Sequence, residues 1–309
     1  MWGLWGTGVN LYGKAEPTRH EAYFVRMKKR SAYGWAMALS GLYLLICMGF
    51  AWVGVYFLPD STLYANQQSP DRAVLPMFSQ GEMSHWLGTD SMGRDLWSRL
   101  VWGIRISMGT GLMAMALSIA LGTLVGLIAG YYRSWVDRVL SWFMQVLWSL
   151  PSVMLVLAFS LALGKGWWQV MLAIGLTMWV DVARMVRGQV MALREREFML
   201  AARMLGLSDW SQMINQLLPN LYKPLMVMAS SVFGSAILLE SGLGFLGLGV
   251  QPPVPSLGMM LKEHVPYLLM GSPHLALAPG LLIFSLVFGF NILGSALSAY
   301  WDTPRSSEG

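Results

Sequence analysis

The residue types that perform catalysis or bind metals are few in this sequence and are not grouped. The four histidines, His20, His85, His264 and His274, are far apart, and the single cysteine, Cys47, lies in an apolar run. Zinc sites and disulfide frameworks need such residues at short, regular spacings. The phosphate-binding pattern GxxxxGK[ST] does not occur either. We therefore predict no catalytic residue, no cofactor, no metal site and no ATP hydrolysis by this chain.

The composition is that of a protein that crosses a membrane several times. Of the 309 residues, 55% are hydrophobic and 12% are charged, and the mean hydropathy is +0.51. The net charge of +5 could suggest nucleic acid as a partner. However, the basic residues stand at the ends of apolar runs, as in membrane proteins. We therefore exclude nucleic acid as a partner and expect an all-α polytopic protein surrounded by membrane lipid.

Six apolar runs are candidates to cross a hydrocarbon core of about 30 Å. They cover residues 34–58, 106–130, 139–163, 167–183, 224–239 and 275–300. With the N-terminus inside, fifteen of the 21 Lys and Arg residues fall in segments on the cytoplasmic side. Because cytoplasmic loops of membrane proteins carry this excess, we predict that both termini are cytoplasmic.

This arrangement divides the chain into five parts. Residues 1–33 form a cytoplasmic tail, 34–58 the first transmembrane helix and 59–105 an extracytoplasmic segment with an amphipathic helix. Asp90 or Ser91 is the expected N-cap of this helix, whose polar face carries Arg94, Asp95 and Arg99 and continues to Arg105. Residues 106–300 form a core transmembrane domain that contains a cytoplasmic loop, 194–220, and residues 301–309 form a second cytoplasmic tail.

Glycines and ionisable residues inside the apolar runs indicate how the helices pack and which transport mechanism is excluded. Gly122, Gly126 and Gly130 recur every four residues, which predicts close packing against another helix rather than a pore. Asp181 stands three residues before Arg184, so we expect an intrahelical ion pair. Asp, Glu and His do not form a series across the membrane, which argues against proton-driven transport.

The segment Glu240 to Pro253, ESGLGFLGLGVQPP, contains a GxGxxG pattern. It follows an apolar helical run rather than a strand, so we reject dinucleotide binding. Its glycines and prolines instead predict an irregular backbone at the outer membrane face, which is tolerated only against protein or a water-filled cavity. Glu240, Gly242, Phe245 and Gly247 are thus our candidates for lining a pathway, with re-entrant packing as the alternative. For Glu240, a hydrogen bond at the membrane interface or between subunits is favoured over a substrate contact.

The polar-faced segment Glu197 to Pro219, EFMLAARMLGLSDWSQMINQLLP, predicts two short helices outside the bilayer. Gly206 stands where a C-terminal cap with positive φ is needed, and Ser208 with Asp209 supplies the next N-cap. Pro219 is expected to stop the second helix. Ala201 and Ala202 leave one side of the first helix flat, which suits the close approach of another protein.

Three stretches resemble one family, the transmembrane subunits of bacterial ABC importers. Glu197, Ala201-Ala202, Gly206 and Leu218-Pro219 resemble the "EAA" loop, although Leu200 and Gln216 depart from its pattern. HWLGTDSMGRDLWSRL, from His85, and FLGLGVQPP resemble signatures of the peptide and nickel subfamily. The run WVDVARMVRGQ is most similar to the C-type permease of oligopeptide importers. Ser295 and Ser298 replace acidic residues of that family.

The resemblance implies a type I importer (MetI-like) transmembrane domain with six helices, in the bacterial inner membrane. It also implies a sister permease, two cytoplasmic ATPase subunits that bind ATP-Mg, and an extracytoplasmic substrate-binding protein. The ATPase-coupling residues would be Glu197, Ala201, Ala202, Gly206, Ser208 and Asp209. Peptides are the expected cargo, with nickel or a metal chelate as the alternative. A self-contained channel or a scaffold is the more distant alternative.

Overall fold

The computed structural model describes residues 19–57, 87–90, 92–164 and 166–302, and all its regular elements are helices. Residues 1–18, 58–86 and 303–309, which hold most of both predicted tails and of the predicted extracytoplasmic segment, lie outside the described residues. The longer helices are α1 (Arg19–Phe57), α3 (Leu96–Tyr132), α4 (Trp135–Trp148), α5 (Ser152–Leu163), α6 (Trp167–Leu193), α10 (Tyr222–Leu246) and α12 (His274–Asp302). The shorter ones are α7 (Glu197–Met204), α8 (Asp209–Ser211), the π-helix η2 (Gln212–Leu217), α9 (Leu218–Asn220), α11 (Leu257–His264) and the 3-10 helix η3 (Val265–Leu268).

Five of the described helices are long and apolar enough to cross a membrane: α1, α3, α6, α10 and α12. The pair α4 and α5 passes the same test only when taken together, which gives up to six spans. This agrees with the predicted six-helix, all-α fold. The sides of the membrane on which the connecting segments lie remain a prediction.

The span predicted over residues 139–163 is not one continuous helix. α4 and α5 are bent by 93° at a break that contains Pro151, which stands just before α5. Proline lacks the N–H that a continuing helix needs, and its ring disfavours helical geometry in the residue before it. The chain therefore turns at Pro151 instead of running on through the apolar stretch.

The glycine stripe of α3 packs on α6, as predicted. A Cβ atom at Gly122 would lie 2.5 Å from Val182 Cβ, and one at Gly126 would lie 2.5 Å from the carbonyl oxygen of Ala183. A Cβ at Gly130 would meet Val190 Cβ at 2.8 Å. Such distances are far below van der Waals contact, so only glycine lets the two backbones approach this closely.

Two helix boundaries differ from those expected. α3 begins at Leu96, ten residues before the predicted span, because the carboxylate of Asp95 caps it by accepting from the Ser98 N–H at 2.8 Å. The residues expected to form a separate amphipathic helix, including Arg99 and Arg105, are thus the first turns of α3. α10 continues through Glu240 to Leu246, so the irregular backbone starts only at Gly247, which has φ +81°.

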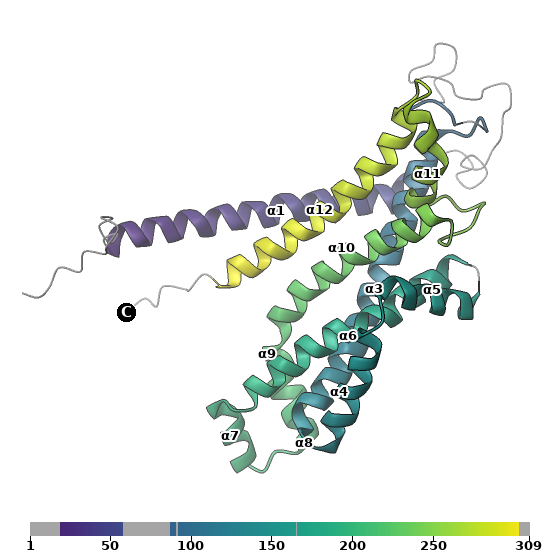
Figure 1. Cartoon of the computed structure of the whole chain (residues 1–309). Helices are drawn as coiled ribbons and strands as arrows, with labels where there is room; N and C mark the ends of the chain where they lie inside the picture. The colour runs from purple at the N-terminus through teal and green to yellow at the C-terminus, as the bar shows by residue number, and fades with distance from the viewer. Residues whose placement is uncertain (1–18, 58–86, 91, 165, 303–309) are drawn as a thin grey trace, which may run out of the picture.

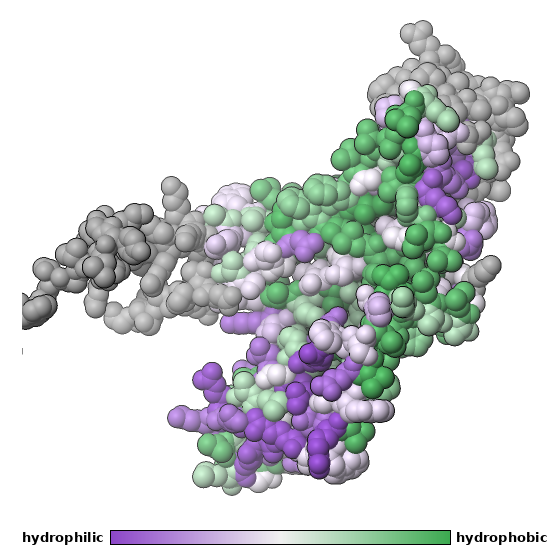
Figure 2. Space-filling view, in the orientation of Figure 1, coloured by the Kyte–Doolittle hydropathy of each residue, from purple (hydrophilic) through white to green (hydrophobic). Residues whose placement is uncertain are grey.

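The helices place two polar regions at opposite ends of an apolar body. In Figure 1, α7 and α8 lie at the lower tip, whereas α11 and the start of α3 lie at the upper right. Figure 2 shows hydrophilic residues gathered at that lower tip and a smaller group beside α11, with mostly hydrophobic residues between them. α12 runs beside both α1 and α10. This is the division expected of a protein that crosses a bilayer.

Candidate functional site

The segment 197–219 has the local structure that the sequence predicts in its first half. α7 begins at Glu197, and the chain turns at Gly206, whose φ of +70° lies in the left-handed region. Ser208 then caps α8, because its side chain accepts from the Ser211 N–H at 3.3 Å. We call residues 197–211 the tip hairpin.

The second half of the segment differs from expectation, because Pro219 does not stop the helix. Residues Gln212–Leu217 form a π-helix, and Pro219 lies in the first turn of α9, which ends at Asn220. α9 follows the π-helix without a break, so Pro219 lies inside a continuous helical stretch that ends one residue later. The wider π-helical turn before it allows the chain to continue toward α10.

The two alanines of the tip hairpin have different environments, which corrects the prediction that both form a contact surface. Ala202 is buried, at 4% exposure, together with Met199, and faces the protein itself. Ala201 is exposed, as is Glu197. Only Ala201 of the pair can therefore contact another protein directly.

Sequence reasoning missed the apolar character of the tip hairpin's free surface. Met204 and Leu205 are 89% and 79% exposed, and Leu200 and Trp210 are also exposed. The signal was present in the sequence, since these large apolar residues stand within a polar segment outside the apolar runs. Exposed apolar side chains of this kind are typical of surfaces that interact with another protein or with a membrane.

The tip hairpin is attached to the end of α3 by polar contacts of the buried Tyr131. The Tyr131 hydroxyl lies 2.7 Å from the carboxylate of Asp209 and 3.0 Å from Gln212 Oε1. The Gln212 amide in turn donates to the Leu207 carbonyl oxygen at 2.7 Å. Asp209, predicted only as part of a cap, therefore also ties the loop to α3.

Of the four pathway candidates, Glu240 is placed elsewhere by the structure. Its side chain is 0% exposed, and its Oε2 accepts a hydrogen bond from Ser107 of α3 at 2.8 Å. The Glu240 side chain is therefore held between α10 and α3 by its hydrogen bond to Ser107. Because it is fully buried there, it does not line an open path. Gly242 and Phe245 are exposed, and Gly247 is partly exposed at the end of α10.

Asp181 and Arg184 do not form the expected direct ion pair among the contacts observed. The indole N–H of Trp148 donates to Asp181 at 3.2 Å, and the guanidinium of Arg184 lies 4.1 Å from the centre of the same indole ring. Trp148 thus engages both groups, which ties the end of α4 to α6.

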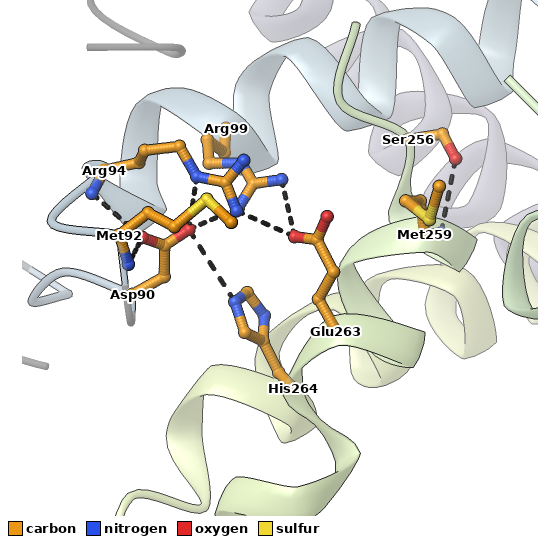
Figure 3. A network of polar contacts seen from close by, with 8 residues as sticks. All are labelled: Asp90, Met92, Arg94, Arg99, Ser256, Met259, Glu263 and His264. Carbon is orange, nitrogen blue, oxygen red and sulfur yellow. Dashed lines mark hydrogen bonds and ion pairs between the residues drawn. The ribbon is translucent and has the colours of Figure 1, made fainter. Parts of the chain in front are cut away.

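A buried network of ion pairs lies at the other end of the molecule (Figure 3). Arg94 donates from Nε to Asp90 Oδ2 at 2.6 Å and from Nη2 to Glu263 Oε2 at 2.9 Å. Arg99 pairs with the same two carboxylates, at 3.0 Å from Glu263. His264 Nε2 lies 3.9 Å from Asp90. The network joins the segment before α3 to α11.

The predicted cap role of Asp90 or Ser91 is therefore corrected. Asp95 caps α3, and Ser91 lies outside the described residues. Burial by itself would raise the pKa of Asp90. The neighbouring His264, the backbone N–H of Arg94 and the charges of Arg99 and Arg94 together outweigh burial and hold the pKa well below its usual range.

Asp90, Glu263 and His264 also come close enough to be considered as metal ligands, with one ligand atom of each within 4.8 Å of the others. Both carboxylates, however, already accept from Arg94 and Arg99. Two guanidinium groups also oppose a cation at this position by charge. The donor set fits an ion-pair network better than a metal centre.

Comparison with known proteins agrees with this architecture. The family described as "Binding-protein-dependent transport system inner membrane component" matches residues 122–303. The chain is 35% identical over 270 residues to the glutathione transport system permease protein GsiD of Pectobacterium atrosepticum, with 87% of each chain covered. It is 33% identical over 278 residues to the dipeptide transport system permease protein DppC of Bacillus subtilis, with 90% of this chain and 83% of the relative covered.

A solved structure shares the fold. The MetNI methionine ABC transporter in an inward-facing conformation aligns with a TM-score of 0.52 and 18% identity, over 64% of this chain and 96% of that chain. The family match covers more than half of the sequence and includes α6, the tip hairpin, α10 and α12. The chain therefore belongs to the binding-protein-dependent transport system inner membrane components, the multi-span permease subunits of ABC importers.

Proposed function

We propose that this chain is one of two permease subunits of an ATP-driven importer of small peptides. The names of its relatives, which refer to glutathione and dipeptide transport, support a peptide cargo over nickel or a metal chelate. Family membership favours an importer subunit over a self-contained channel. The chain would form half of the pathway, with a sister permease supplying the other half.

The observation that carries the proposal is the tip hairpin, an exposed apolar surface at the polar end of an apolar body. Met204 and Leu205 provide the apolar contact, Ala201 permits close approach, and Glu197 adds a carboxylate beside it. A cytoplasmic ATPase subunit is the partner that this surface would dock against. Two such subunits would bind and hydrolyse ATP-Mg, since members of the family are permeases and not catalytic subunits.

The docked hairpin would transmit movement because it is stiffly connected. Gly206 supplies the reversal of the chain, Ser208 starts α8, and Asp209 holds the loop to Tyr131 of α3. ATP-driven closure of the ATPases would move α3, and with it the packed α6, as a unit between two states. A substrate-binding protein would deliver peptide on the extracytoplasmic side.

The proposed orientation puts the tip hairpin and both chain ends in the cytoplasm. The excess of basic residues in the predicted inner segments supports this orientation. The separation of the two polar regions in Figure 2 is consistent with it, because the tip hairpin and α11 would then lie on opposite sides of the bilayer.

The test introduces a charge on the exposed face of the hairpin. Ala201→Asp, in cells that carry the complete transporter, should lower uptake of a radiolabelled dipeptide by at least about tenfold, since an unpaired charge in an interface costs a few kcal/mol. Ala192→Asp is the matched control, because Ala192 is also exposed but lies outside the hairpin, in the last turn of α6.

Membrane abundance of both variants is measured by immunoblotting. If Ala201→Asp transports as well as Ala192→Asp at equal abundance, the docking role of the hairpin is wrong. Competition for uptake by unlabelled dipeptide, with Ni²⁺ added in parallel, tests the cargo. Inhibition by Ni²⁺ alone would contradict the peptide assignment.

A further inference from the structure

A polar groove lies between α10 and α12, away from the tip hairpin and from the ion-pair network. It has a volume of about 500 Å³, and its polar lining consists of Ser231, Asn291, Ser295 and Ser298. Ionisable side chains are not among its lining residues in the described part of the chain. Polar side chains on two membrane-spanning helices generally face a protein interior or a water-filled cavity, not lipid.

The exposed face of α12 changes character along its length. Leu277, Leu281, Phe284 and Phe288 are exposed and follow the spacing of one helix face. The same face continues with Asn291 and Ser295, which are exposed as well. The helix is therefore apolar on this face up to Phe288 and polar beyond it, in the half that ends at the predicted cytoplasmic side.

α10 presents a matching face beside it. Ser231, Leu238, Gly242 and Phe245 are exposed and also recur at helical spacing on one side. Two of the residues predicted to line a pathway, Gly242 and Phe245, thus share a face with Ser231 of the groove. Ser231 lies nearer the tip hairpin along α10, and Phe245 lies near the opposite end.

The base of the groove is closed by tight helix packing. A Cβ atom at Gly294 would lie 2.9 Å from Ser230 Cβ, so α10 and α12 approach closely there. At one end, the rings of Phe233 and Phe290 stack with centroids 3.5 Å apart. The Asn291 amide donates to the Val287 carbonyl oxygen at 2.9 Å, which fixes the position of this side chain.

We propose that the α10–α12 groove is the cytoplasmic half of the peptide pathway in this subunit, and that it contacts the peptide backbone through neutral hydrogen-bonding groups. The inference rests on the proposed function. Hydroxyl and amide groups can donate to and accept from amide groups of any peptide. Because the described lining residues carry no full charge, they would hold neither the amino nor the carboxyl terminus of a peptide by an ion pair, which suits release into the cytoplasm.

The test measures water access to the groove in the assembled transporter. Cys47 is the single cysteine, so Cys47→Ala gives a background without thiols in this chain. Ser231→Cys and Ser295→Cys are then made separately, with Leu45→Cys on the exposed face of α1 as the control. Inside-out membrane vesicles that contain the complete transporter are treated with the charged thiol reagent MTSET, and dipeptide uptake is measured in the parent cells.

The two groove cysteines should react about tenfold faster or more than the Leu45→Cys control, because the reactive thiolate forms in water and not in lipid. Saturating dipeptide should slow both reactions. If both groove cysteines are inert while uptake is normal, the groove is packed against the sister permease, and this inference fails while the proposed function stands. If neither the unaltered chain nor the Cys47→Ala background supports dipeptide uptake, although both are abundant in the membrane, the proposed function itself fails.

Discussion

The hydroxyl of Tyr131 lies 2.7 Å from the carboxylate of Asp209, which joins the last turn of α3 to the start of α8. Tyr131 is buried, and Arg194 lies over its ring at 5.2 Å from the centre. This contact joins the tip hairpin directly to a helix that is long and apolar enough to span a membrane.

Tyr131→Phe should weaken coupling while leaving the fold intact. The change removes the hydroxyl contacts to Asp209 and Gln212, at a cost of about 1 kcal/mol. We expect a lower ratio of dipeptide uptake to ATP hydrolysis in the reconstituted transporter. Parallel uptake and phosphate-release assays measure this ratio. Tyr132→Phe is the control, since Tyr132 is exposed and packs edge-on against Tyr131. An unchanged ratio of uptake to hydrolysis in Tyr131→Phe would show that the contact is not part of the coupling route.

Gly206→Pro should abolish transport, because proline holds φ near −65° whereas Gly206 has φ +70°. Gly206→Ala should have a smaller effect, since a left-handed conformation costs a residue with a Cβ about 1–2 kcal/mol. Gly188→Ala is the matched control, because its Cβ would meet nothing within 4 Å and its φ is not positive. Dipeptide uptake, measured at equal membrane abundance, should therefore be highest in Gly188→Ala, lower in Gly206→Ala and lost in Gly206→Pro. Normal uptake by Gly206→Pro would contradict the role of this turn.

Gly126→Ala should destabilise the packing of α3 on α6 by about 1–3 kcal/mol, as expected for overpacking. The added Cβ would lie 2.5 Å from the carbonyl oxygen of Ala183, and backbone cannot move away as a flexible side chain can. The midpoint of thermal unfolding in detergent should fall by several degrees, as estimated for changes of this size. Gly41→Ala on α1 meets nothing within 4 Å and should leave the midpoint unchanged. Equal midpoints for the two variants would contradict close α3–α6 packing in the solubilised protein.

Asp90→Asn should destabilise, at neutral pH, the end of the molecule that holds the ion-pair network. The pKa of Asp90 is lowered in the folded state, so its ionised form stabilises the fold at any pH above the unfolded value of about 4. As pH falls below about 4, this contribution decreases and is lost once the pH passes the lowered folded pKa.

The difference in thermal midpoint between the unaltered chain and Asp90→Asn should therefore be constant from pH 7 to about pH 5 and shrink below about pH 4. Glu263→Gln is the comparison, and its effect should be smaller because Glu263 is partly exposed. A difference that grows as the pH falls would have the wrong sign for this network.

Local rules account for the features that sequence reasoning predicted correctly. The turn at Gly206, the cap at Ser208 and the stripe of Gly122, Gly126 and Gly130 depend on residues a few positions apart. The apolar runs likewise reflect the length that a helix needs to cross a bilayer. These features follow from backbone conformation and helix periodicity, which neighbouring residues determine.

The sites that sequence reasoning misplaced depend on contacts between distant residues. Ala202 and Glu240 are buried by their surroundings, and Glu240 reaches Ser107, 133 positions away. Arg94 and Arg99 each contact both Asp90 and Glu263 of α11. Nothing near Asp90 in the sequence indicates that Glu263 completes this network. Only the packed helices decide such pairings, because burial of a charged or polar group must be balanced by whichever partner the fold brings near.

The sequence by itself therefore determined the class of protein, the apolar runs, the loop outside them and the residues that turn it. The tertiary structure decided which face of that loop is free, where the chain bends at Pro151, and how Ser231 and Ser295 come to line one groove. The physical reason is that helix formation is local, whereas exposure and the partners of buried polar groups depend on how the helices pack.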